Sequence, residues 1–120
     1  MNVKARQRAR IEMHMKLCDI EFGRHAGEII FPKRFLPPER WDTKAFAEAS
    51  RAIDRHLGIV ARELDGREFL VGDHFSAADL VYLPLLQFLP LMEVTTPAAV
   101  STWAERLLSR PSAMATVPDR

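Results

Sequence analysis

The chain has 120 residues, which is enough for one domain with its own hydrophobic core. Seventeen Lys and Arg against sixteen Asp and Glu leave a net charge of +1, so nothing in the balance attracts nucleic acid or anionic lipid. The single cysteine, Cys18, cannot form an internal disulfide, and the N-terminal MNVKARQRAR has no apolar stretch of a secretory signal behind it. We therefore expect a cytoplasmic protein.

The first expected element is a helix over roughly residues 3–30. Two apolar rows with spacings of three and four predict a helix that buries surface against more than one neighbour. One row contains Ile11, Met15, Cys18 and Phe22, and the second contains Met13, Leu17 and Ile20. Gly23 and Gly27 weaken the second half of this helix, and Pro32 is expected to end or kink it.

The segment PKRFLPPERWDT, residues 32–43, holds three of the eight prolines and is expected to be a loop. Asp42 or Thr43 can then cap a second helix, and Gly66 is a natural stop for it. The apolar seam of this helix repeats at alternating spacings of three and four. Its members are Phe46, Ala49, Ile53, Leu57, Val60 and Leu64.

The third element contains the apolar run of residues 80–92, in which Gln87 is the only strongly polar member. Ser76 and Asp79 have the spacing of a capping box, which predicts a helix that begins at about Ala77. A helix that is apolar all round belongs in the middle of a bundle, and Pro84 is expected to bend it. The run is too short to cross a bilayer, which needs about 20 apolar residues.

A fourth helix is expected from Pro97 to Arg110, with one more turn possible in the tail SAMATVPDR. The sum is an all-α bundle of four to five helices around a buried central helix that starts at about Ala77. We expect residues 1–120 to form one domain, with residues 1–2 and 117–120 frayed.

Several groups resemble chemical sites, and each has a simpler structural explanation. His14 and Cys18, four residues apart, are half of a tetrahedral metal site or a thiol beside a base, but ordinary packing is favoured for both. Met13, Met15 and Phe22 suit either an adaptable apolar pocket or the core, and the core is favoured. The basic run Lys4, Arg6, Arg8 and Arg10 fits a solvated helix better than a phosphate-binding stripe, because alternate residues scatter around a helix. Ser76 and Asp79 are expected to be a structural cap.

The segment FLVGDHFSAADLVYLPLL strongly resembles the entry to the central helix of the glutathione S-transferase C-terminal domain, where a Ser or Thr and an Asp form the folding cap. PAAVSTWAERLLSRPSAM is similar to the next helix of that family, with its Arg-Pro ending. DIEFGRHAGEIIFPKRF is similar to the first helix of that domain, and is nearest to the phi and theta-like classes.

Enzymes of this family also have an N-terminal thioredoxin-like domain that activates the glutathione thiol, and nothing in the chain resembles it. The resemblance therefore implies an acceptor-substrate and dimer-forming half, with no catalytic residue of its own and no cofactor bound by this domain alone. Glutathione is implied for the full-length enzyme, and an apolar electrophile as the acceptor. The residues implied to line the acceptor site are His14, Met15, Cys18 and Phe22.

The implied partners are a second copy of the chain or a thioredoxin-like domain, because an apolar surface would otherwise be exposed. The alternative is a stand-alone helical module that binds other proteins without catalysis. A weaker third hypothesis is an apolar small-molecule binder that does not use glutathione. No metal, nucleic acid or membrane is expected as a partner.

Overall fold

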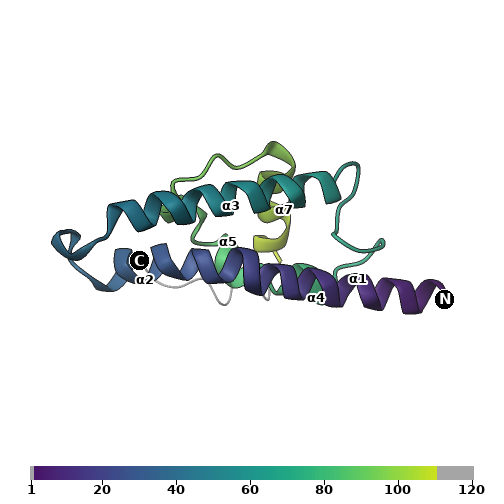
Figure 1. Ribbon diagram of the computed structural model, residues 1–120. Coiled ribbons are helices and arrows are strands. Elements are labelled where there is room, and N and C mark those ends of the chain that lie inside the picture. The colour runs from purple at the N-terminus through teal and green to yellow at the C-terminus, as the bar shows by residue number, and fades with distance from the viewer. Residues whose placement is uncertain (1, 111–120) are drawn as a thin grey trace.

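The computed structural model describes residues 2–110, and all regular secondary structure in that range is helical (Figure 1). Two long helical segments lie side by side and antiparallel. The first is continuous through α1 (Val3–Leu17), η1 (Cys18–Gly23) and α2 (Arg24–Phe35), and the second is α3 (Thr43–Glu63). The predicted all-α class is confirmed.

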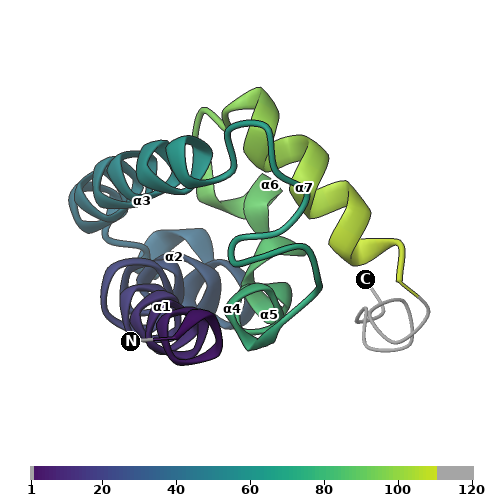
Figure 2. The ribbon, with the colours of Figure 1, turned by 90° about the vertical axis from the view of Figure 1, so that its right-hand side faces the viewer.

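The apolar run beside this pair is not one helix but three single turns. They are α4 (Ala77–Leu80), α5 (Leu83–Leu86) and α6 (Leu89–Met92), and they lie between the long pair and α7 (Ala98–Leu108) (Figure 2). The predicted start at Ala77 is confirmed, but the predicted continuity is wrong.

Two prolines explain the interruption, since Pro84 and Pro90 each occupy the second position of a new turn. Neither can donate a backbone hydrogen bond to the turn before it, so the helical ladder stops twice. The run is also less buried than expected: Tyr82 and Leu86 are buried, whereas Leu80 is half exposed. One side of this segment therefore faces the core and the other does not.

A π-helical turn, η1, lies at the centre of the first helix. Its buried residues include His14, Cys18, Phe22 and Ala26, each four residues after the last. In an α-helix every such step rotates the side chain by about 40°, because a turn takes 3.6 residues. The wider π turn takes up one extra residue and returns the row to the core side. The helix continues past Pro32 and ends at Phe35, five residues beyond the predicted end at Ile30.

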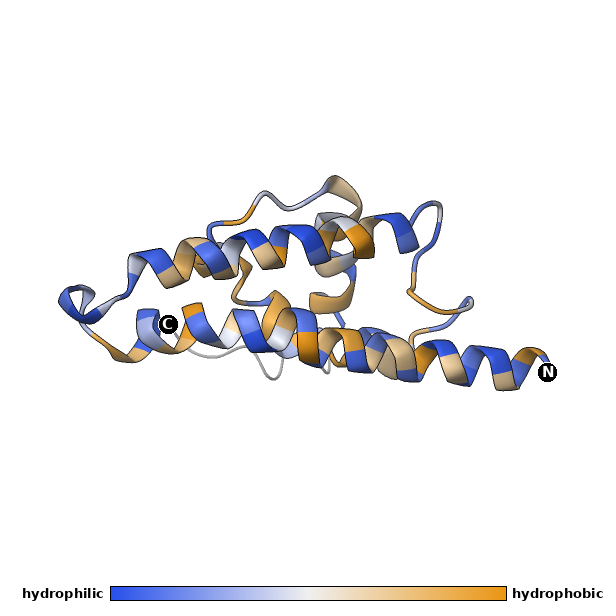
Figure 3. Cartoon of the chain, in the orientation of Figure 1, coloured by the Kyte–Doolittle hydropathy of each residue, from blue (hydrophilic) through white to orange (hydrophobic). Residues whose placement is uncertain are grey.

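The second apolar row predicted on this helix is not buried. Met13 and Ile20 are 44% and 51% exposed, and Leu17 between them is only partly buried. Met15, from the first row, is 38% exposed. The predicted helix does pack against more than one neighbour, since its segments contact α3, α4 and α6. The second row does not supply these contacts, and hydrophobic positions interrupt the polar surface along the helix (Figure 3).

The second long helix, α3, follows its predicted pattern closely. Asp42 caps it by accepting a hydrogen bond from Ala45 N at 3.0 Å, and Gly66 beyond its end has φ +70°. All six residues of the predicted seam are buried: Phe46, Ala49, Ile53, Leu57, Val60 and Leu64. The loop before it contains a short 3₁₀ turn, η2 (Pro38–Arg40).

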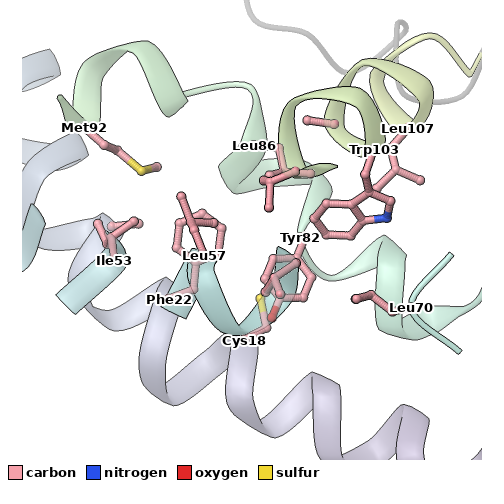
Figure 4. Close-up of a cluster of buried hydrophobic side chains, with 14 of the residues drawn as sticks. Cys18, Phe22, Ile53, Leu57, Leu70, Tyr82, Leu86, Met92, Trp103 and Leu107 are labelled. Carbon is pink, nitrogen blue, oxygen red and sulfur yellow. The ribbon is translucent and has the colours of Figure 1, made fainter. Parts of the chain in front are cut away.

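The core fills the space between α3, the first helix, the short turns and α7. Phe22, Tyr82 and Trp103 converge there from three elements (Figure 4), and Tyr82 packs edge-on against Trp103 at 5.2 Å between ring centroids. Trp103 comes from α7, which begins after Pro97 as predicted and ends at Leu108. The expected further turn after residue 111 and the expected fraying at residues 1 and 117–120 lie outside the described residues. Asn2, also expected to fray, accepts a hydrogen bond from Ala5 N.

The predicted capping box is present, and it does more than start a helix. Ser76 Oγ accepts from Ala78 N at 3.2 Å, and Ser76 N donates to Asp79 Oδ2 at 3.0 Å. The other carboxylate oxygen, Asp79 Oδ1, accepts from Leu70 N at 3.1 Å and from Trp103 Nε1 at 3.0 Å. Asp79 is fully buried, so it joins the α3–α4 loop, the cap and α7 at one point.

Replacing Asp79 by Ala should lower the free energy of unfolding by about 3 kcal/mol or more, because buried donors then lose a charged acceptor. Ser76→Ala is the matched control and should cost only about 1 kcal/mol, the usual value of an N-cap. Urea denaturation of the two variants measures the difference. Equal losses would show that Asp79 acts only as a cap.

Candidate functional site

A small apolar pocket lies between the π-helical turn η1 and the short turns α4 and α5. Its cavity volume is about 300 Å³, at the lower end for small-molecule sites. Most of its lining side chains are apolar, and one carboxylate is present. The lining residues are Met15, Cys18, Asp19, Gly23, Val81 and Leu85.

Gly23 lines this pocket from the π-helical turn. A β-carbon at this position would lie 3.4 Å from the carbonyl oxygen of Cys18 in the same turn and 3.7 Å from Cδ1 of Leu85 across the pocket. Both are ordinary van der Waals distances, so an alanine would fit and would narrow the pocket slightly. The residue that the sequence indicated as a helix-weakening glycine is a lining residue of the pocket.

Cys18 belongs to the pocket wall, but its thiol is not a nucleophile at neutral pH. It is 3% exposed, and its sulfur lies 3.6 Å from the carbonyl oxygen of Val81, which accepts its S–H. Burial, with the nearby carboxylate of Asp19, raises the pKa of Cys18 to about 12. A thiol with this pKa stays protonated, and the interpretation of Cys18 as a packing residue fits its surroundings.

The four residues indicated for an acceptor site occupy two different places. Met15 and Cys18 line the pocket, whereas His14 and Phe22 are buried on the core side of the same helix. His14 Nε2 lies 3.9 Å from Glu63 Oε2, which is paired with Arg10 at 3.0 Å. His14 and Phe22 therefore lie in the core and not in the lining of the pocket.

The core behind this wall contains a second histidine, His56, whose Nε2 lies 2.7 Å from the hydroxyl of Tyr82. The ring of Phe22 packs against both, with centroids 5.9 Å from His56 and 5.5 Å from Tyr82. Burial raises the pKa of the Tyr82 hydroxyl, so Tyr82 stays neutral. The sequence analysis missed this pair because residues 26 positions apart meet only in the folded chain.

Burial is also the main influence on both core histidines, and it lowers the pKa of each below the ordinary value of 6.5. For His14, the charge of Glu63 opposes this shift and that of Arg10 adds to it. For His56, the charge of Glu21 opposes the lowering of the pKa, and that of His14 adds to it. Nε2 of His14 and Nδ1 of His56 have no hydrogen-bond partner among the described residues. Both imidazoles are therefore neutral in the folded protein at pH 7.

Within residues 2–110, no group of three or more His, Cys, Asp or Glu side chains is arranged to hold a metal ion. In the same range, no helix is long and apolar enough to cross a membrane. The lining of the pocket beside η1 is that of an apolar binding site with one carboxylate, Asp19.

The chain matches the family described as glutathione S-transferase, C-terminal domain, over residues 26–111. Among solved structures it is similar to glutathione transferase F2 from Populus trichocarpa, with a TM-score of 0.79 and 24% identity over 96% of this chain and 56% of that one. It is also similar to poplar glutathione transferase F1, with a TM-score of 0.76 and 23% identity over 89% of this chain and 52% of that one.

A structure titled glutathione S-transferase III in its apo form gives a TM-score of 0.74 at 21% identity, covering 93% of this chain and 56% of that one. The chain thus spans just over half the length of these proteins, and the likeness to them shows the fold. No curated protein matches the chain.

The two neutral histidines make the stability of the fold depend on pH in a defined direction. Because their folded pKa values lie below 6.5, the unfolded chain binds more protons, and stability is lost as the pH falls through 6.5. Each histidine adds a slope of up to about 1.4 kcal/mol per pH unit. In the His56→Gln variant, the free energy of unfolding measured by urea denaturation should therefore decline less steeply below pH 6.5.

The matched control is His74→Gln, since His74 is exposed and its loss should leave the slope unchanged. An unchanged slope in His56→Gln would show that His56 binds its proton equally well in the folded and the unfolded chain, so that burial does not lower its pKa.

Proposed function

Because the chain belongs to the glutathione S-transferase C-terminal domain family, we propose that it is the acceptor-substrate and dimer-forming half of a glutathione transferase-like protein. We further propose that these 120 residues do not conjugate glutathione by themselves. The observation that carries the proposal is the apolar pocket that includes Met15 and Cys18, on a helix of this family's fold.

In this proposal the pocket places an apolar electrophile, and its residues transfer no proton. Met15 is partly exposed at the edge and has a flexible thioether that adapts to irregular ligands. Cys18 supplies an apolar wall, and His14 and Phe22 hold that wall from the core side. No catalytic residue is assigned.

The electrostatics of the pocket support the absence of conjugation by the chain alone. A free thiol titrates near about 8.5, so glutathione needs a group that stabilises its thiolate at neutral pH. The charged side chain in the pocket lining is Asp19, whose field raises the pKa of the neighbouring Cys18 thiol. A carboxylate at this position disfavours a thiolate placed in the pocket. Glutathione chemistry is therefore assigned to a thioredoxin-like domain acting together with this one.

The exposed apolar side chains support a protein partner. Met13 and Ile20 are seven residues apart, two helical turns, and lie on one side of the first helix with Leu17 between them. We propose that this row is an interaction surface. We assign it to a second copy of the chain or to a thioredoxin-like domain, in a cytoplasmic protein whose buried Cys18 stays reduced.

The second candidate is a stand-alone helical module that binds other proteins without catalysis. The same row of Met13, Leu17 and Ile20 favours it, because this surface is available without any ligand in the pocket. The two candidates differ in what the pocket does: the module does not need it, whereas the transferase half requires it to take up an electrophile.

Light scattering coupled to size-exclusion chromatography, with and without glutathione and the model electrophile chlorodinitrobenzene, tests the main proposal. We expect a discrete dimer and no turnover above the buffer control. Turnover would contradict the assignment of thiol activation to another domain. A heterogeneous or aggregating sample would show that the exposed row requires the thioredoxin-like domain as its partner.

Two methionine variants separate the pocket from the dimer surface. Met15→Arg should abolish the changes that chlorodinitrobenzene causes in the NMR signals of Val81 and Leu85, while leaving the dimer intact. Met13→Arg should dissociate the dimer and leave those changes in place. If both variants bind the electrophile equally, the pocket is not the acceptor site.

A further inference from the structure

A second cavity, of about 420 Å³, lies at the other end of the first helix, between α2, α3 and the end of α6. It is lined by two aromatic rings, two hydroxyl groups, one positively charged side chain and one negatively charged side chain. The lining residues are Lys33, Trp41, Thr43, Phe46, Ala47, Ser50 and Glu93, and none of them belongs to the pocket that contains Met15 and Cys18.

Lys33 is the unusual residue of this cavity, because its side chain is only 11% exposed although it carries a charge. Its Nζ donates to the carbonyl oxygen of Leu91 at 2.6 Å. The same nitrogen lies over two aromatic rings, 6.0 Å from the centroid of Trp41 and 5.6 Å from that of Phe46. A largely buried ammonium needs a carbonyl, a ring face or a carboxylate beside it, and here it has all three.

The aromatic wall is held rigidly in place. Trp41 Nε1 donates to the carbonyl oxygens of Pro32 at 2.9 Å and Leu36 at 3.0 Å, and the Trp41 ring packs against Phe46 at 5.8 Å between centroids. Ser50 Oγ donates to the carbonyl oxygen of Met92 at 2.8 Å, so its oxygen remains able to accept a hydrogen bond. A ligand would meet a preformed surface.

Of the groups that surround Lys33, the carboxylate is the one that a ligand could replace. Glu93 Oε1 lies 3.3 Å from Lys33 Nζ, but the Glu93 side chain is 77% exposed and is thus held weakly. Glu93 is also the non-glycine residue with positive φ, 54°, in the described part of the chain. Strained residues of this kind are concentrated at binding and switch positions. Glu93 occupies the place that the acid group of a ligand would take.

We propose that this cavity binds a flat aromatic carboxylate, whose acid group replaces Glu93 on Lys33 and whose ring lies against Trp41 and Phe46. The cavity volume lies within the range of small-molecule sites. A cationic ligand is disfavoured, because the Lys33 ammonium beside the same two rings would repel its charge. This binding is independent of the acceptor pocket proposed above.

Calorimetric titration of the 120-residue chain with 2-naphthoate, and with the neutral 2-naphthamide, tests the proposal. We expect 2-naphthoate to bind more tightly than the amide and to shift the indole N–H signal of Trp41. Glu93→Gln removes the competing carboxylate and should tighten 2-naphthoate binding by about two- to fivefold, the scale of an exposed ion pair. The control Glu12→Gln, an exposed glutamate on α1, should change nothing.

Lys33→Met should remove the preference for 2-naphthoate over 2-naphthamide. If that variant does not fold, Glu93→Gln and the comparison of the two ligands still decide. Equal binding of acid and amide, no binding of either, or an unchanged affinity in Glu93→Gln would each overturn the proposal. Met15→Arg should leave 2-naphthoate binding intact, so the outcome here is separate from that of the acceptor pocket.

Discussion

The fold depends on one buried carboxylate. Asp79 accepts hydrogen bonds from the backbone of Ser76 and Leu70 and from the indole of Trp103, and these groups belong to the cap, the preceding loop and α7. A short turn such as α4 has little stability of its own, because helix nucleation is unfavourable. Its place is therefore set by the tertiary contacts that Asp79 makes. The wall of the pocket formed by Val81 and Leu85 follows directly from that turn.

The π-helical turn in the first helix is the second constraint. Four-residue spacing from His14 to Ala26 would carry the buried row off the core side of an α-helix, and the extra residue in η1 returns it. The same turn places Cys18 and Gly23 in the pocket wall. Core packing and pocket shape thus have one local cause.

The buried polar groups have contrasting roles. His14 and His56 are held neutral in the core, where an unpaired charge would be costly. Lys33 keeps its charge nearly out of solvent because Leu91, two aromatic rings and Glu93 surround it. The first arrangement makes the fold sensitive to acid. The arrangement around Lys33 places a positive charge beside a rigid aromatic wall, and an aromatic acid would fit there.

Elements whose signals are local can be predicted from the sequence. The seam of α3, the cap at Asp42 and the capping box of Ser76 and Asp79 each follow from spacings of three or four residues, which survive in any packed helix. The resemblance carried by the cap also identified the family. For the same reason, the sequence placed Met15 and Cys18 on the helix that lines the pocket.

Which apolar residues are covered, and which long-range partners meet, depends on the packing of the whole chain and does not follow from local patterns. Met13 and Ile20 share the periodicity of a buried row, yet no described element packs over them. Pro84 and Pro90 divide the apolar run into separate turns, and whether each turn holds depends on α7 and the first helix around it. His56 with Tyr82, and Lys33 with Glu93, are far apart in the chain. Periodicity reports the direction of a side chain from its own helix, whereas burial depends on what the rest of the chain places opposite it.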